Sequence, residues 1–389
     1  MTESLRDGGP IIDRETLDKL EPEWDRLLAQ SDVSSPFLTP GWQRAWLATY
    51  GRGGQPVILT ARIGGRLAGV WPLFAARRGP FRVLAPIGTG RSDWLDVLTT
   101  SPDRQAVLGA FLDYLSSTDH TWDLLEIRDI RADSPTITAL ESLCAIRALK
   151  TRHEPRTAAP YLTLTGNWDG YLASKSGNFR SNLRRRQRRA DAHEPPLIIA
   201  RNDADLLRDD YASIIDELGH IELKSWKAGH GNLKISTVEG RDFYSRFLKH
   251  FGSRGELDLW RARLGDKLVA FLINITYHGK CYYYNSSFDL EHADLSPGLL
   301  LHAAAVADAF DRGLREYDFL SGEEPFKFLW CSTTRPIHHA AIFNDRATSR
   351  VAFAMLVAVR WAFRRSSLLV RLRQRGLAAM RRLLRRPQT

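Results

Sequence analysis

Residues 317–330 read Tyr317-Asp318-Phe319-Leu320-Ser321-Gly322-Glu323-Glu324-Pro325-Phe326-Lys327-Phe328-Leu329-Trp330. The aromatic and apolar start is typical of a strand, and Ser-Gly is a turn signal that ends it. Two acids, a proline and a lysine then follow among aromatic side chains. Charges placed this closely among large apolar groups indicate a strand that leaves the core and carries charge into a cleft. A plainer interpretation, a strand and a turn with an edge lysine, is also open.

Length and charge limit the classes of protein to consider. The chain has 389 residues, of which 43% are hydrophobic. This length predicts two domains, and the apolar content argues against disorder. Residues 346–389 hold 12 arginines and no acid, so the net charge of +10 belongs to this tail and residues 1–345 carry a net charge of −2. A near-neutral body argues against a nucleic-acid-binding protein.

Cysteine use and the N-terminus predict a cytoplasmic protein. Cys144, Cys281 and Cys331 are far apart and show no metal-ligand spacing, so we expect reduced thiols. Residues 1–10 lack the apolar core of a signal peptide. The longest apolar run, 351–359, is far shorter than the roughly 20 residues that span a bilayer. No metal box, P-loop or Rossmann fingerprint is present, and we expect no metal.

The order of apolar runs predicts an α+β fold with an internal duplication. Two β-hairpins are expected, at 57–74 around Gly64-Gly65 and at 257–277 around Gly265-Asp266. A strand–helix–strand pattern follows each hairpin, at 81–86, 105–116 and 122–127, with an added strand at 94–98, and at 281–287, 297–312 and 317–320. We therefore expect domains at 1–155 and 156–345, and a basic helical tail at 346–389.

The segment Ser296-Pro297-Gly298-Leu299 is expected to begin a helix, with serine at the N-cap and proline in the first turn. Glycine lets a ligand approach closely, and the free N–H groups and dipole of a helix N-terminus attract anions. A pyrophosphate would fit there. A well-capped helix with no ligand is the alternative.

Residues 178–192 predict a strongly basic helix. Six arginines lie between Arg180 and Arg189, and Phe179 and Leu183 give the helix a buried edge. Arg180 and Arg184 are candidates for a clamp on phosphates or on an anionic substrate. A solvated surface helix is the alternative, and no base-stacking aromatic residues support nucleic acid.

Two further segments carry candidate side chains. Trp226 and Lys227 end a helix and precede a glycine-rich loop, where they would cover a substrate or simply pack beneath the loop. Tyr284 lies on a predicted strand with its side chain opposite to that of Tyr283, where it would donate a proton or only pack.

Together these pieces resemble the CelD-type acyltransferases of the GNAT superfamily, which are related to the Fem-type aminoacyl transferases. The likeness covers about residues 20–345 and rests on motifs that occur in the order of that family. They are Pro36-Phe37-Leu38-Thr39-Pro40 with Trp42 and Trp46, Phe179-Arg180 with the arginine helix, Leu223 to Trp226, and Ser296-Pro297-Gly298 with Tyr317-Asp318-Phe319, Gly322 and Lys327.

The resemblance implies two tandem GNAT-like units, each a mixed, largely antiparallel sheet flanked by helices. The second unit would bind acyl-CoA, such as acetyl-CoA, as cosubstrate at Ser296, Pro297, Gly298 and Leu299. Only Gly298 remains of the usual glycine-rich phosphate loop, which puts strong coenzyme A affinity in doubt. Fem-type relatives use aminoacyl-tRNA, so the donor stays open.

The expected activity is transfer of an acyl group to an amine or hydroxyl, on a small molecule, a sugar or a polysaccharide precursor. Asp318 or Glu323 would accept the proton of the acceptor, Lys327 would stabilise negative charge, and Tyr284 would protonate the thiolate. Arg180, Arg184, Trp226 and Lys227 would bind substrate. The alternatives are a Fem-like aminoacyl transferase and a catalytically degenerate binding protein.

The tail from 347 to 386 alternates apolar residues with arginines. A basic amphipathic helix of this kind predicts peripheral binding to an anionic membrane surface at the inner face of the membrane. A helix that docks on the body with its arginines exposed is the alternative.

Overall fold

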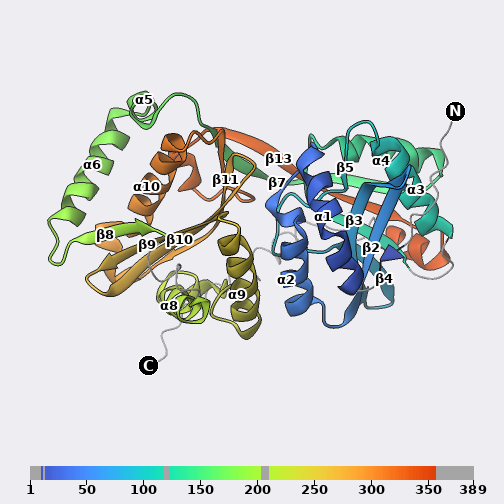
Figure 1. The fold of residues 1–389 in the computed structure, drawn as a ribbon, viewed down its shortest axis with the longest axis horizontal. Helices are drawn as coiled ribbons and strands as arrows, with labels where there is room; N and C mark the ends of the chain where they lie inside the picture. Colours follow the sequence, from blue (N-terminus) through green and yellow to red (C-terminus); the bar gives the residue numbers. More distant parts are fainter. Residues whose placement is uncertain (1–9, 12–13, 118–121, 203–209, 356–389) are drawn as a thin grey trace, which may run out of the picture. The chain divides into compact units, whose positions relative to one another are not determined.

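The computed structural model describes the chain except residues 1–9, 12–13, 118–121, 203–209 and 356–389. The chain forms two compact units. Unit 1 comprises residues up to Ala158 together with the segment that begins at Arg335, and unit 2 comprises Ala159–Thr334. We describe each unit separately (Figure 1).

Unit 1 holds a mixed sheet with helices packed against it. Along the chain it contains β1 (Pro10–Ile11), α1 (Arg14–Gln30), α2 (Pro40–Tyr50), β2 (Gly54–Ile63), β3 (Arg66–Arg78), β4 (Phe81–Pro86), β5 (Leu98–Thr99), α3 (Arg104–Ser117), β6 (Leu124–Arg131), α4 (Pro135–Ile146) and most of β7 (Lys150–Thr163). Its strands are ordered β1-β2-β3-β4-β6-β13, with β13 spanning Thr333–Phe343.

Unit 2 repeats this plan. It contains α5 (Trp168–Ser174), α6 (Gly177–Asp191), β8 (Leu197–Arg201), α8 (Tyr211–Lys224), α9 (Val238–Ser253), β9 (Leu257–Leu264), β10 (Lys267–Tyr277), β11 (Lys280–Phe288), α10 (Pro297–Asp311) and β12 (Glu316–Asp318). Its strands are ordered β7-β12-β11-β10-β9-β8.

The expected α+β fold with two similar units is confirmed. In unit 1 the hairpin β2–β3 is followed by β4, α3 and β6, and in unit 2 the hairpin β9–β10 is followed by β11, α10 and β12. Strand β4 pairs with β6 in parallel, as β11 pairs with β12. All other pairs in both units for which a register is recorded are antiparallel.

Two expectations were wrong in detail. A strand at 94–98 is reduced to β5, because Trp94 has φ 55° and so cannot continue an extended backbone. The second domain was expected to run to 345, but residues from Arg335 belong to unit 1, where β13 pairs with β6.

The C-terminal tail is described only at its start. Residues 347–355 are helical, and the rest of the predicted tail lies outside the described residues. In the described part of the chain, no helix combines the length and apolar character that crossing a membrane requires.

Unit 2 packs helices on both faces of its sheet. Helix α10 covers one face together with α5 and α6, while α8 and α9 cover the other (Figure 1). The core beneath α10 includes Leu300, Leu301 and Val306 from the helix, with Cys281 and Tyr317 from the strands. The two faces matter because residues that alternate along β11 and β12 point to different sides.

A glycine at the start of α9 tests how tightly this unit is packed. In Gly240→Ala the new Cβ would lie 1.8 Å from the carbonyl oxygen of Lys234, which is backbone and cannot swing away. We expect a loss of about 2 kcal/mol in unfolding free energy, measured by chemical denaturation. Gly177→Ala in the first turn of α6 meets nothing within 4 Å and should change stability little. Equal stability of both variants would contradict the packing described here.

Candidate functional site

The two parallel strands of unit 2 separate after a short contact. Strands β11 and β12 pair at three positions, where Lys280, Cys281 and Tyr282 lie opposite Glu316, Tyr317 and Asp318. Strand β12 then ends, whereas β11 continues to Phe288. Beyond Tyr282, no strand among the described residues pairs with the edge of β11 that faced β12.

A bulge in β11 turns side chains toward α9. Asn274 pairs with Tyr283 and Ile273 pairs with Asn285, so Tyr284 is the extra residue of a β-bulge. The Tyr284 ring contacts Tyr244 of α9 at 5.8 Å between centroids. Asn285 also faces α9, because its Nδ2 donates to the Tyr244 hydroxyl at 2.9 Å. The bulge thus places two consecutive side chains on one face.

The loop after β11 leads into the N-terminus of α10. Ser296 stands at the expected N-cap with φ 56° and ψ 45°, but its side chain does not cap the helix. Its hydroxyl accepts a hydrogen bond from Arg186 Nη1 instead. Gly298 is half-buried, and a Cβ there would lie 3.2 Å from the Phe288 ring. Pro297 is buried and Leu299 half-buried.

The arginine helix α6 lies beside this terminus through residues other than the expected pair. Arg186 contacts Ser296, and Arg189 Nη2 lies 2.6 Å from a carboxylate oxygen of Asp294. Among the described residues, the hydrogen bonds from α6 arginines to this loop come from Arg186 and Arg189, and not from the predicted pair Arg180 and Arg184. The buried edge predicted from Phe179 and Leu183 is confirmed, since Leu183 is buried and Phe179 packs against the same core, and Ala190 extends this edge.

Most of the arginines on α6 are not neutralised. Within the described residues, Arg189 is the only arginine of α6 with a carboxylate within 4 Å. Arg185 and Arg186 donate to the side-chain oxygen of Asn182, and Arg188 donates to the backbone oxygen of Arg184. The helix therefore presents several unbalanced positive charges next to the N-terminus of α10.

The decisive segment 317–330 forms a tight loop around Lys327. The ammonium of Lys327, whose residue is 3% exposed, donates to the carbonyl oxygens of Leu320, Ser321 and Gly322 at 3.3, 2.8 and 3.2 Å. It also pairs with Glu324 at 2.9 Å. The buried ammonium and its acceptors hold the loop together, so Lys327 stabilises the structure in addition to any role it has in the reaction.

The other expected residues of this segment differ in exposure. Asp318 is buried, and its Oδ1 accepts the N–H of Leu320 at 2.8 Å. Glu323 is exposed. The sequence alone did not point to His302 of α10, which is buried with its ring 5.0 Å from that of Tyr283. Burial lowers the pKa of His302 to about 3, and Lys327 adds to the effect, so the imidazole is neutral at pH 7.

Trp226 and Lys227 at the end of α8 point to different environments. Trp226 is 43% exposed, with its ring 5.7 Å from that of His230. Lys227 is only 5% exposed, and its Nζ donates to Asn285 Oδ1 at 2.5 Å and to the Ser286 carbonyl at 2.7 Å. Burial lowers the pKa of Lys227 to about 7, with Lys234 acting in the same direction and Glu222 opposing.

One cluster has the residue types of a metal site. Ligand atoms of Asp289, Glu291 and His292 lie within 4.8 Å of one another. The Nζ of Lys267 is 3.9 Å from the Asp289 carboxylate, 3.6 Å from that of Glu291 and 3.0 Å from His292 Nε2. The ammonium group of Lys267 therefore occupies the position between these ligand atoms that a metal cation would need.

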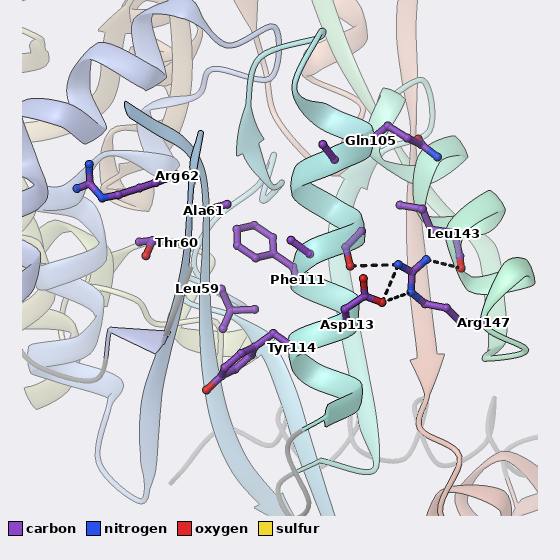
Figure 2. A pocket seen from close by; sticks show the side chains of 13 residues that line it. Leu59, Thr60, Ala61, Arg62, Gln105, Phe111, Asp113, Tyr114, Leu143 and Arg147 are labelled. Carbon is purple, nitrogen blue, oxygen red and sulfur yellow. Dashed lines mark hydrogen bonds and ion pairs between the residues drawn. The ribbon is translucent and has the colours of Figure 1, made fainter. Parts of the chain in front are cut away.

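Unit 1 has a cleft of about 440 Å³ between β2, α3 and α4 (Figure 2). Each charged side chain that lines the cleft is in an ion pair. Arg147 pairs with Asp113 at 2.7 Å and donates to the carbonyls of Gly109 and Leu143, while Arg62 pairs with Glu23 outside the cleft. These pairs satisfy the charges and leave unit 2 as the better candidate for chemistry.

The family comparison selects the same unit. Residues 177–328 match the family described as "Acetyltransferase (GNAT) domain", a range that runs from the start of α6 to Phe328 and includes the strand separation. This segment is similar to GNAT acetyltransferases. No protein with a curated description matches the chain. The finer resemblance to CelD-type enzymes stays a prediction.

Solved structures share the fold over most of the chain at low sequence identity. FemX has a TM-score of 0.59 and 14% identity, covering 82% of this chain and 95% of its own. L-PGS from Bacillus licheniformis has a TM-score of 0.51 and 12% identity, covering 92% and 99%. The C-terminal domain of a putative lysylphosphatidylglycerol synthetase from Agrobacterium fabrum has a TM-score of 0.50 and 11% identity, covering 88% and 96%.

The contacts of Lys327 predict a measurable effect on stability. Lys327→Met removes the donor to three carbonyls and should lower the unfolding free energy by about 2 kcal/mol, since hydrogen bonds to charged groups contribute more than neutral ones. Lys249→Met, at an exposed position of α9, is the control and should change it by less than about 0.5 kcal/mol. Chemical denaturation of both variants measures the difference. A Lys327→Met protein as stable as the control would show that the loop does not need the ammonium.

Proposed function

We propose that this protein is an acyltransferase that moves an acyl group from acyl-CoA to an amine or hydroxyl acceptor. The observation that carries the proposal is the separation of β11 from β12 after Tyr282, on the strand that leads through a short loop to the N-terminus of α10. An extended donor can hydrogen-bond to the open edge of β11 while its phosphates reach the helix terminus. The match to GNAT acetyltransferases over residues 177–328 supports this donor class.

The phosphate end of the donor would meet α6 as well as α10. Arg186 is the arginine on α6 that already contacts Ser296, so its guanidinium can move a short way to a phosphate. With one glycine, Gly298, at this terminus, arginine contacts would compensate for the missing backbone donors of a glycine-rich loop. Ser296, Pro297 and Leu299 would form the rest of the binding site.

The acyl end would lie where the two strands separate. Asp318 and Lys327 stand at the end of β12 and in the loop after it, and Tyr284 lies at the bulge of β11. We keep Lys327 as the group that stabilises negative charge on the thioester carbonyl. Asp318, Glu323 and Tyr284 remain candidates for proton transfer. The exposed ring of Trp226 offers a face against which a sugar or another acceptor can pack.

A second candidate function is transfer of an aminoacyl group from tRNA. The unbalanced arginines of α6 favour it, and so does the fold shared with FemX and with a protein named lysylphosphatidylglycerol synthetase. The net charge of −2 over residues 1–345 argues against it. A catalytically degenerate binding protein is the outcome if neither donor binds.

Binding of acetyl-CoA tests the first candidate. We expect acetyl-CoA to raise the melting temperature, and Arg186→Ala to weaken its Kd about tenfold, a loss of about 1.4 kcal/mol. Arg188→Ala, exposed on the same helix, is the matched control and should bind as the wild type does. Calorimetric titration measures all three proteins. The absence of any thermal shift with acetyl-CoA would exclude it as the donor.

Salt dependence of tRNA binding tests the second candidate. If α6 holds tRNA phosphates, log Kd should rise steeply with log salt, and each of Arg184→Ala and Arg188→Ala should reduce the slope by about 1. Filter binding of unfractionated tRNA at several salt concentrations measures the slope. A shallow slope that neither variant changes would remove this candidate.

A further inference from the structure

We propose that Lys227 is the proton-transfer residue of the acyl-transfer site, taking the proton from the acceptor and passing it to the leaving thiolate. The inference rests on the proposed function and deepens it. It assigns to Lys227 a catalytic part instead of the substrate-binding part that its sequence position suggested. The argument starts from where its amine lies on the sheet.

The amine of Lys227 lies at the open edge of β11. Asp289 donates its N–H to Val269, and pairs along an antiparallel ladder alternate between bonded and non-bonded. The pair Asp289–Val269 is hydrogen-bonded, so Phe288–Ala270 is non-bonded, Ser287–Phe271 is bonded and Ser286–Leu272 is non-bonded. The Ser286 carbonyl therefore points away from β10, toward the side where β12 has ended. Lys227 Nζ binds that carbonyl at 2.7 Å.

The amine has one hydrogen-bonding position left. An ammonium has three donors, and within the described residues Lys227 uses two of them, on Asn285 Oδ1 and Ser286 O. Glu222 Oε1 lies 4.0 Å from the amine, which is too far for a hydrogen bond. That oxygen is itself buried and has no hydrogen-bond partner. A donor and an acceptor, both unsatisfied and 4.0 Å apart, are spaced to be bridged by a single hydroxyl or amine.

Hydrogen bonds fix the position of the Glu222 side chain beside the amine. Glu222 Oε2 accepts the backbone N–H groups of Lys234, Ile235 and Ser236 and the Ser236 hydroxyl. Burial lowers the pKa of Lys227 to about 7. A base is most effective when its pKa lies near the working pH.

The groups that face Lys227 come from four segments. Glu222 approaches from α8 and Lys234 from the loop before α9. Asn285 comes from β11 and connects it to the Tyr244 hydroxyl of α9. Of these, Glu222 favours the charged amine and Lys234 disfavours it, and both act less than burial does.

The step balances without any further reagent. The acceptor R–XH, where X is nitrogen or oxygen, attacks the thioester carbonyl, and the X–C bond forms while the neutral Lys227 amine takes the proton from X. The C–S bond then breaks, and the thiolate of coenzyme A takes that proton from the Lys227 ammonium. The products are the acylated acceptor and coenzyme A thiol, and the amine is neutral again.

Kinetics with acetyl-CoA test the proposal, with hydroxylamine as the acceptor probe and release of free thiol as the readout. In the wild type, kcat/KM should fall on the acid side with an apparent pKa of about 7. Lys227→Met should lower kcat at least 100-fold, in the range of general acid–base catalysis, while the Kd for acetyl-CoA changes less than about threefold. Lys249→Met is the matched control and should retain wild-type kinetics.

Asn285→Asp gives a second measurement that does not depend on losing activity. A carboxylate 2.5 Å from Nζ would favour the charged amine and raise its pKa. The acid limb of the pH profile, where kcat/KM falls as the pH is lowered, should therefore move to higher pH. A merely structural lysine would leave the limb in place in this variant. An unmoved limb, or a Lys227→Met protein with kcat within fivefold of the wild type, would overturn the assignment while the acyltransferase stands. A wild type that neither binds nor turns over acetyl-CoA would overturn both.

Discussion

The separation of two parallel strands is the constraint on which unit 2 depends. A buried sheet normally pairs every backbone group, and an edge left open inside a protein costs free energy unless something satisfies it. Strand β12 stops after three pairs while β11 continues. Lys227 satisfies one backbone group of that edge, the carbonyl of Ser286, and Lys327 satisfies three carbonyls of the loop that follows β12.

Two buried lysines flank the opening in different ways. Lys327 turns back on its own loop and donates to three successive carbonyls, whereas Lys227 crosses from α8 to bind the bulged part of β11. Lys327 also has a carboxylate oxygen of Glu324 at 2.9 Å, whereas Glu222 Oε1 lies 4.0 Å from the amine of Lys227. The cost of burial is therefore offset only in part at Lys227, and burial lowers its pKa to about 7.

The sequence predicted the architecture better than the site. Hairpins around Gly64-Gly65 and Gly265-Asp266, and the helix that begins at Pro297, follow from local turn chemistry and appear as expected. Lys227 was predicted only as a substrate-binding residue and Arg186 was not singled out, because their contacts depend on the bulge at Tyr284 and on how α6 packs beside the loop before α10. Pairing register and helix rotation are tertiary properties that a run of residue types does not encode locally. Trp94 shows the same limit, since its positive φ has no local signature.

The duplication also shows why one unit carries the candidate site and the other does not. In unit 1 the helix that corresponds to α10 is α3, and Asp103 stands directly before it, bound to Arg66 and Thr100. A carboxylate at that position already satisfies the helix dipole and repels a second anion. In unit 2 the corresponding position holds Ser296, in contact with Arg186. The same order of elements thus gives two helix termini of opposite electrostatic character, and only the one in unit 2 suits an anionic donor.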